Sequence, residues 1–218
     1  MAITATWDNT GERYFEGGCD RGMIFPMTNN AYGKGVVWNG LTSVQRSPTG
    51  GDANDLYADN ILYATLRSVE KEQGTIEAYT YPDEFALCDG SASMGTGVVA
   101  YGQPRKMFGL TYRTRIGNET DGFDKGYKIH LLYGCTVSPS SQQHDTINSD
   151  PSAVTFSWEF SCAGTNDTTT GVTLKPISHI VIDSTKVDAT KLTSFEETLY
   201  DGNAMPLPAT VRSAFSSQ

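Results

Sequence analysis

Apolar and polar side chains alternate along two neighbouring stretches, and this alternation predicts a long β-hairpin from Met107 to Val137. The first stretch places four apolar side chains on one face of its strand: Phe108, Leu110, Tyr112 and Ile116. Arg113 and Arg115 fall on the opposite face, and the polar stretch from Asn118 to Gly126 joins the two strands. The predicted hairpin therefore has one apolar face for a core and one cationic face that suits a partner.

A second clean alternation runs from Val154 to Cys162 and predicts a strand that anchors the core. The stretches Ile61 to Lys71 and Thr75 to Tyr81 predict two further strands around a tight turn at Gln73 and Gly74. Strand-like stretches are thus spread along most of the chain, as expected for a mainly β protein.

Helical signals are fewer. Pro82 suits a first helical position, acidic residues follow it, and Gly90 ends the short helix that they predict. A Gly-rich connection is expected from Gly90 to Gly102. Thr190 to Tyr200 carries an apolar stripe with helical spacing and predicts a second helix, with a capping box at Thr193 and Glu196.

The segment from Gln45 to Asn60 is rich in Ser, Pro, Gly, Asp and Asn, and this composition predicts a long loop. A loop of that length inside a compact domain is usually functional or disordered. We therefore expect this segment to serve an interaction rather than to support the core.

These elements predict a β-sandwich or open barrel with one or two flanking short helices and a long inter-strand loop. No Pro-, Ser- or Gly-rich stretch is long enough for a linker, so residues 1–218 are expected to form one domain. Within it we expect an N-terminal segment at 1–35, a β core at 36–183 that includes the loop at 45–60, and a C-terminal helix and tail at 184–218.

The charge balance limits the possible partners. The chain has 16 Lys plus Arg against 25 Asp plus Glu, a formal net charge of -9, which argues against tight binding of nucleic acid. Met1 to Gly18 lacks the basic start and apolar run of a signal peptide, and no stretch is apolar enough to span a membrane. No membrane association is expected.

The chain carries no recognisable catalytic pattern. Its four cysteines, Cys19, Cys88, Cys135 and Cys162, are widely spaced, without the close pairs of zinc or dithiol sites, and are expected to be buried thiols. The three histidines are also far apart in the sequence, and nucleotide, metal-protease and nucleophile-elbow motifs are missing. We therefore expect no enzymatic activity, no cofactor and no metal.

Five segments together resemble the major tail tube protein of long-tailed, non-contractile bacteriophages, in particular phages of Gram-positive bacteria. They are Leu56 to Asn60 (LYADN), Glu77 to Gly90 (EAYTYPDEFALCDG), Phe108 to Thr114 with Gly117 and Asn118, Gly126 to Gly134 (GYKIHLLYG), and Val154 to Phe160.

The resemblance implies a structural virion protein that is made in the host bacterial cytoplasm and self-assembles into stacked, hexameric rings. The rings form the tail tube, through which double-stranded DNA passes during ejection. The implied partners are the protein itself, the tape measure protein, the tail terminator and the distal tail proteins.

In that family a long loop reaches a neighbouring subunit, and Gln45 to Asn60 is the corresponding segment here. The expected self-assembly residues in or beside it are Pro48, Gly50, Asp55, Tyr57, Asp59 and Asn60. The chain's own pattern adds Arg113 and Arg115, which we expect to contact acidic residues of an adjacent copy.

Two other interpretations stay open. A carbohydrate- or receptor-binding β-sandwich module would use exposed tyrosines and carboxylates. A jelly-roll glycoside hydrolase would need two converging carboxylates on inward positions of one sheet, and the clearest predicted strand places Glu159 on its outward face.

Overall fold

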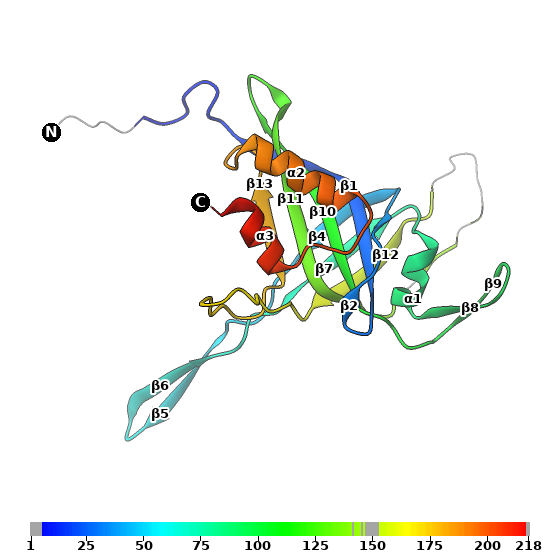
Figure 1. Cartoon of the computed structure of the whole chain (residues 1–218). Coiled ribbons are helices and arrows are strands. Elements are labelled where there is room, and N and C mark those ends of the chain that lie inside the picture. Colours follow the sequence, from blue (N-terminus) through cyan, green and yellow to red (C-terminus); the bar gives the residue numbers. More distant parts are fainter. Residues whose placement is uncertain (1–5, 141, 145, 147–152, 217–218) are drawn as a thin grey trace.

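A nine-stranded antiparallel sheet dominates the computed structural model, which describes residues 6–140, 142–144, 146 and 153–216. The sheet consists of β1 (Phe15–Thr28), β2 (Ala31–Tyr32), β3 (Val36–Val37), β4 (Leu41–Arg46), β7 (Glu72–Ala78), β10 (Phe108–Asn118), β11 (Gly122–Val137), β12 (Phe156–Cys162) and β13 (His179–Asp183). Its order is β2-β1-β10-β11-β12-β7-β4, with β13 also paired to β11 and β3 also paired to β1 (Figure 1).

The sheet curls into an open barrel. Its path ends at β4, yet β3, which precedes β4 by a turn at Asn39 and Gly40, pairs back with β1. Next to that pairing, the Trp38 amide donates a hydrogen bond to the Gly22 carbonyl at 2.8 Å. The mainly β fold class with an open barrel and short flanking helices is thus confirmed.

Side chains that alternate inward along the strands fill the barrel. The core inside the barrel includes Ile24, Trp38, Ile76, Phe85, Phe108, Leu110, Tyr112, Leu132, Cys135, Trp158, Phe160 and Cys162. Trp158 is fully buried, and its ring centroid lies 5.6 Å from that of Trp38 and 5.1 Å from that of Phe85. The inward positions predicted for Phe108, Leu110 and Tyr112 are confirmed, and so are those of the strand that ends at Cys162, although this strand begins at Phe156 rather than at Val154.

A second apolar layer lies between the outer wall of the barrel and two helices, α2 (Ala189–Tyr200) and α3 (Pro208–Phe215) (Figure 1). It joins outward residues of the strands to the apolar stripe of α2 in one cluster that includes Phe25, Ile129, Leu131, Tyr133, Ile182, Leu192, Phe195 and Leu199. The helix predicted at Thr190 to Tyr200 is therefore confirmed. Its cap is Asp188 rather than the predicted box, because the Asp188 carboxylate accepts from the Thr190 and Lys191 amides.

The short helical segment after Pro82 is also confirmed. A 3₁₀ turn at Asp83–Phe85 leads into α1 (Ala86–Asp89), which ends at Gly90 in the left-handed conformation, with φ of 82°. This segment brings Phe85 and Cys88 into the core of the barrel.

The N-terminal segment belongs to the sheet, so the prediction that the β core starts at residue 36 is wrong. β1 lies between β2 and β10, with register shifts on both sides of Asp20. These irregularities break the period-two pattern, which explains why the sequence did not reveal this long strand. At the other end, 184–216 holds α3 besides α2.

Candidate self-assembly interface

A β-hairpin arm formed by β5 (Ala53–Ala58) and β6 (Ile61–Arg67) stands out from the barrel (Figure 1). Asp59 and Asn60 connect its strands with φ of 50° and 64°, which fits a two-residue type I′ turn. The predicted loop from Gln45 to Asn60 is therefore wrong. Most of it forms the end of β4, the strand β5 and this turn.

The arm is the outer half of one long hairpin whose inner half, β4 and β7, lies in the barrel. Val44 pairs with Ile76, Thr49 forms a bridge with Lys71, and Leu56 pairs with Ala64. These three pairs share one register, because the two residue numbers of each pair add up to the same total, and the register shifts by one between Leu56 and Tyr57. The predicted tight turn at Gln73 and Gly74 is consequently wrong, since both residues lie within β7.

An ion pair marks the place where the ribbon leaves the barrel. The Arg46 guanidinium donates from Nε and Nη2 to both carboxylate oxygens of Glu72, each at 2.8 Å. Glu72 is buried, so this two-pronged contact holds the inner end of the arm in one geometry. Beyond it, Gly50 has φ of 91°, and a side chain there would overlap the Val69 carbonyl.

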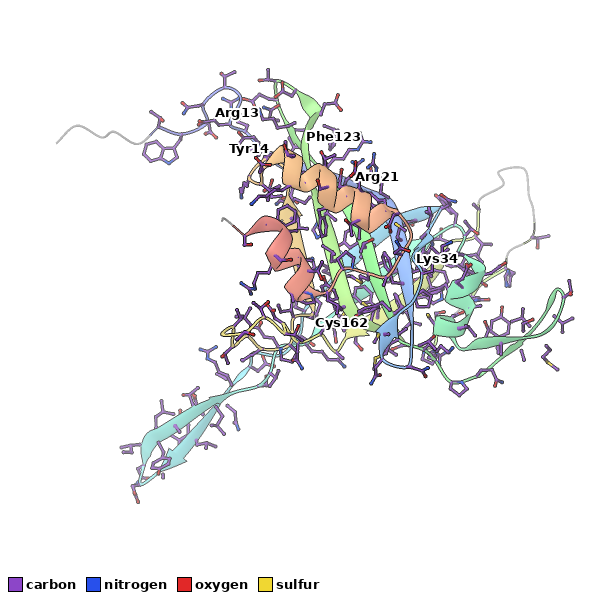
Figure 2. All side chains as sticks on the ribbon, in the orientation of Figure 1. Arg13, Tyr14, Arg21, Lys34, Phe123 and Cys162 are labelled. Carbon is purple, nitrogen blue, oxygen red and sulfur yellow. The ribbon has the colours of Figure 1, made fainter. Side chains whose placement is uncertain are left out.

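The arm has two chemically different faces. Strand alternation and cross-strand pairing put Asn54, Leu56, Ala58, Ile61, Ala64 and Leu66 on one face, which is apolar apart from Asn54. The other face is more polar and includes the hydrogen bond from Thr65 Oγ1 to the Asp55 carboxylate at 2.7 Å. All of β5 is exposed, and Ile61 and Leu66 are 64% and 55% exposed. The apolar face is therefore open to solvent (Figure 2).

Six of the sequence-predicted assembly residues lie in this ribbon. Asp55 and Tyr57 belong to β5 and Asp59 and Asn60 to its turn, whereas Pro48 and Gly50 precede β5 near the barrel: all are exposed. The sequence did not single out the apolar side chains Leu56, Ile61 and Leu66. Their alternation with polar neighbours around the Asp-Asn turn is the signal that could have found them.

A second hairpin, formed by β8 (Ser91–Gly95) and β9 (Val98–Tyr101), replaces the predicted Gly-rich connection. Its residues carry no charged side chain, and Met94, Val98, Val99 and Tyr101 are all about half exposed or more. Figure 1 shows it on the opposite side of the barrel from the arm. The molecule thus offers apolar side chains to solvent in two directions.

The two predicted arginines lie elsewhere, on the outer face of β10. Both bind the carboxylate of Asp20 on β1: Arg113 donates to it at 2.7 and 2.9 Å, and Arg115 donates to it at 3.1 Å. These hydrogen bonds lower the pKa of the Asp20 carboxyl below its usual range. Arg113 also stacks over the ring of Tyr127, with 4.7 Å between the guanidinium carbon and the ring centroid.

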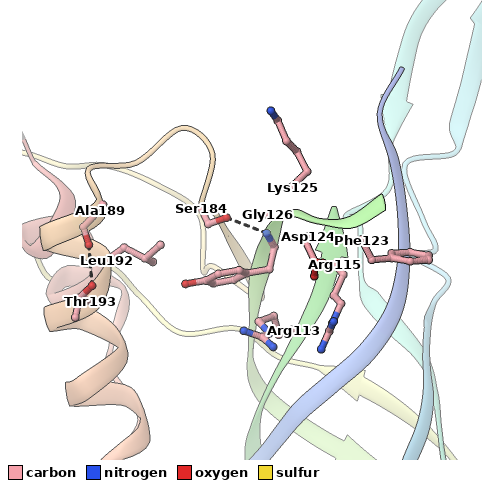
Figure 3. A pocket seen from close by; sticks show the side chains of 11 residues that line it. Arg113, Arg115, Phe123, Asp124, Lys125, Gly126, Ser184, Ala189, Leu192 and Thr193 are labelled. Carbon is pink, nitrogen blue, oxygen red and sulfur yellow. Dashed lines mark hydrogen bonds between the residues drawn. The ribbon is translucent and has the colours of Figure 1, made fainter. Parts of the chain in front are cut away.

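Arg113 and Arg115 differ in exposure. The Arg113 side chain is 12% exposed, whereas that of Arg115 is 48% exposed. Both line a cavity of about 460 Å³ between the end of the β10–β11 hairpin and α2, together with Phe123, Lys125 and Leu192 (Figure 3). Within one chain, the acidic partner of both arginines is Asp20. Contact with an adjacent copy of the chain stays a prediction, and it suits Arg115 better than Arg113 because the Arg115 side chain is more exposed.

The structure does not bring the two groups of predicted residues together. The arm extends from one side of the barrel, and the β10–β11 turn and α2 lie at the other end (Figure 1). Any contact between the arm and the arginine-lined cavity therefore requires two copies of the chain.

Two histidines come together although they are far apart in the sequence. His130 Nδ1 lies 3.1 Å from His179 Nε2, and His130 Nε2 lies 3.0 Å from the Thr114 hydroxyl. Burial lowers the pKa of His130 to about 4 and that of His179 to about 3, so both rings are neutral at pH 7. In the part of the chain that the structure describes, no group of three or more metal-ligating side chains is found.

Comparisons with known proteins add a weak structural likeness. The sequence matches no family model and no curated protein. Among solved structures, a chain of the six-fold symmetrised cryo-EM structure of the anti-feeding prophage (AFP) baseplate aligns with 84% of this chain and 97% of its own length, at 9% identity and a TM-score of 0.31. Identity and TM-score this low carry no functional argument. No helix among the described residues is long and apolar enough to cross a membrane.

Proposed function

We propose that this chain is a structural subunit of a phage-type tail, which assembles with copies of itself through the β5–β6 arm into rings that stack into a tube. Its role is geometric, and it catalyses no reaction. The segments that resemble the major tail tube protein supply the expectation of six copies per ring, of DNA passage through the tube, and of tape measure, terminator and distal tail proteins as partners.

The open apolar face of the arm carries this proposal. A two-stranded hairpin with no third element against it is marginally stable in water. Leu56, Ile61 and Leu66 lie on that face, and each is at least 39% exposed. Burying such side chains is favourable by about 1.5–3 kcal/mol each, so a matching surface on a second copy would stabilise the arm.

The placement of the arm favours a head-to-tail contact. It leaves one side of the barrel, whereas Arg115 and the cavity beside it lie at the other end (Figure 1). A contact between two different surfaces of the same molecule produces closed rings or helical filaments. Asp55 and Asp59 make the arm acidic, which suits the half-exposed guanidinium of Arg115.

The net charge fits passage of DNA. With a net charge of -9, the protein lacks the excess of Lys and Arg that neutralises phosphates and holds a duplex. A tube built from such subunits would let the duplex move without retaining it. Assembly in the host cytoplasm and residence in the virion tail are the corresponding locations.

The arm can be removed without disturbing the barrel. The Ser68 amide donates to the Asp52 carbonyl at 3.1 Å, so two glycines in place of residues 53–67 can rejoin the chain. We expect negative-stain electron microscopy to show rings or tubes of the full chain and single particles of the shortened variant. Circular dichroism should show that the variant keeps its sheet.

Arg67→Gln serves as the control, because it changes one polar residue and leaves the arm in place. It should assemble as the full chain does. Tubes formed by the shortened variant would overturn the role of the arm. A full chain that stays monomeric at every concentration and is retained on a carbohydrate column would favour the binding-module interpretation instead.

A further inference from the structure

Two buried cysteines face each other inside the barrel. Cys135 on β11 is paired with Cys162 on β12, and their sulfur atoms are 3.0 Å apart. Both are free thiols, exposed by 0% and 4%. The sulfur atoms need to approach by only about 1 Å to reach the length of a disulfide bond. Figure 2 labels Cys162 among the side chains of the barrel.

The backbone between the two cysteines has the geometry of a cross-strand disulfide. The Ser138 amide donates to the Glu159 carbonyl, and the Ala163 amide donates to the Gly134 carbonyl. Hydrogen-bonded pairs alternate with non-hydrogen-bonded pairs in an antiparallel ladder, so Cys135 and Cys162 occupy a non-hydrogen-bonded pair. Their Cα atoms are then about 4.5 Å apart, within the 4.4–6.8 Å range of disulfides.

We propose that Cys135 and Cys162 form an oxidation site, which a small neutral peroxide converts into an intramolecular disulfide. The proposal does not depend on self-assembly. It concerns the covalent state of the barrel after the protein has left the reducing interior of the cell. Outside the cell, thiols are no longer kept reduced.

The reaction balances with one peroxide molecule. The Cys162 sulfur, the less buried of the two, attacks a peroxide oxygen, the O–O bond breaks and water leaves, which gives a sulfenic acid. The Cys135 sulfur then attacks the Cys162 sulfur, the S–S bond forms, the S–O bond breaks, and the departing hydroxide takes the Cys135 proton to form a second water. Burial raises the pKa of the Cys135 thiol, so Cys135 keeps its proton until the S–S bond forms.

The disulfide would fasten β11 to β12 at the base of their connection. The two cysteines are 27 positions apart, and the residues between Val137 and Phe156 that the structure describes belong to no strand. A cross-link that closes a loop of this size reduces the conformational freedom of the unfolded chain, so it should raise the melting temperature by about 5 to 10 °C.

Hydrogen peroxide treatment of the purified full chain tests this inference. Intact mass spectrometry should show the loss of two hydrogen atoms, and two of the four cysteines should remain open to alkylation after denaturation. Peptide mapping should locate the bond between Cys135 and Cys162, and the reductant dithiothreitol should reverse both the mass change and the rise in melting temperature.

Cys135→Ala and Cys88→Ala form a matched pair of variants, because each removes one buried thiol of the same core cluster. Cys88→Ala should still lose two hydrogen atoms, whereas Cys135→Ala should not. Four alkylated cysteines after peroxide treatment of the wild type, or a bond that involves Cys19 or Cys88, would overturn the inference. Gain of oxygen at Cys162 without a cross-link would overturn it as well.

Discussion

The two halves of the ribbon from β4 to β7 are continuous in register from Val44 to Leu56 and differ completely in surroundings. In the barrel half, the side chains of β7 alternate between buried and half-buried positions, and Ile76 is fully buried. In the arm half, every residue of β5 is exposed. Both halves nevertheless carry an apolar face, with Val44 and Ile76 inside the barrel and Leu56 and Leu66 on the arm.

This difference shows that an apolar face does not require a core within the same chain. The barrel half meets β12 and the aromatic core, so its alternation is satisfied within the molecule. The arm half continues the same alternation of apolar and polar side chains outside the barrel. A second copy can supply the missing surface, and this is the basis of the proposed assembly.

The largest effect on folding is expected from the barrel core. Trp158→Ala removes a fully buried ring and the hydrogen bond from its indole N–H to Asp89 at 3.1 Å. The substitution should lower the free energy of unfolding by about 3–5 kcal/mol. Urea denaturation followed by circular dichroism measures this loss.

The arm offers a matched comparison for that substitution. Tyr57 is an aromatic residue of the outer half and is 71% exposed, so Tyr57→Ala should change the free energy of unfolding by less than about 0.5 kcal/mol. Similar losses for Trp158→Ala and Tyr57→Ala would contradict the contrast between the two halves.

A smaller effect is expected from acid. An unfolded chain binds protons to His130 and His179 below about pH 6.5, whereas the folded barrel keeps both rings neutral until about pH 4 and about pH 3. The two histidines thus contribute stability above pH 6.5 that is lost as the pH falls. The free energy of unfolding should decrease by about 2 kcal/mol for each of the two histidines between pH 7 and pH 5.

Urea titrations of the wild type at pH 7 and pH 5 give this difference directly. The variant with His130→Gln and His179→Gln should show a weaker dependence on pH over the same interval. His144→Gln should leave the dependence unchanged, because His144 is exposed. An equal slope in all three proteins would show that other groups cause the acid sensitivity.

The smallest effect on folding is expected from the apolar face of the arm. Leu56→Ser combined with Ile61→Ser removes two exposed side chains, so the free energy of unfolding of the monomer should change by less than about 0.5 kcal/mol per site. Urea denaturation at low protein concentration measures this value. A loss of several kcal/mol would show that the arm packs against the body.

Sequence reasoning found the elements whose apolar side chains recur at a regular spacing over most of their length. The hairpin of β10 and β11, the strand β12 and the helix α2 were predicted within a few residues. In each of these elements, buried apolar residues recur at the spacing of a strand or a helix, and Phe108, Trp158 and Phe195 are examples. The strand β1 was missed because register shifts interrupt its pattern. The helix α3 has only eight residues and no side-chain cap, so its local signal is weak.

The sequence singled out the segment that holds the candidate interface, but the predicted conformation of that segment was wrong. Asp, Gly and Asn residues suggested a loop, whereas Asp59 and Asn60 supply the positive φ values of a hairpin turn. The pairs His130–His179 and Cys135–Cys162 lay beyond sequence reasoning, because each depends on which strands are neighbours and in which register.

Sedimentation velocity of the wild type and of the Leu56→Ser, Ile61→Ser variant tests the central claim most directly. The wild type should sediment as rings or larger assemblies that grow with concentration. The variant should sediment as a monomer under the same conditions. Ala53→Ser with Arg67→Gln changes the opposite face of the arm and should behave as the wild type. Assembly of the apolar-face variant to the same extent as the wild type would contradict the account.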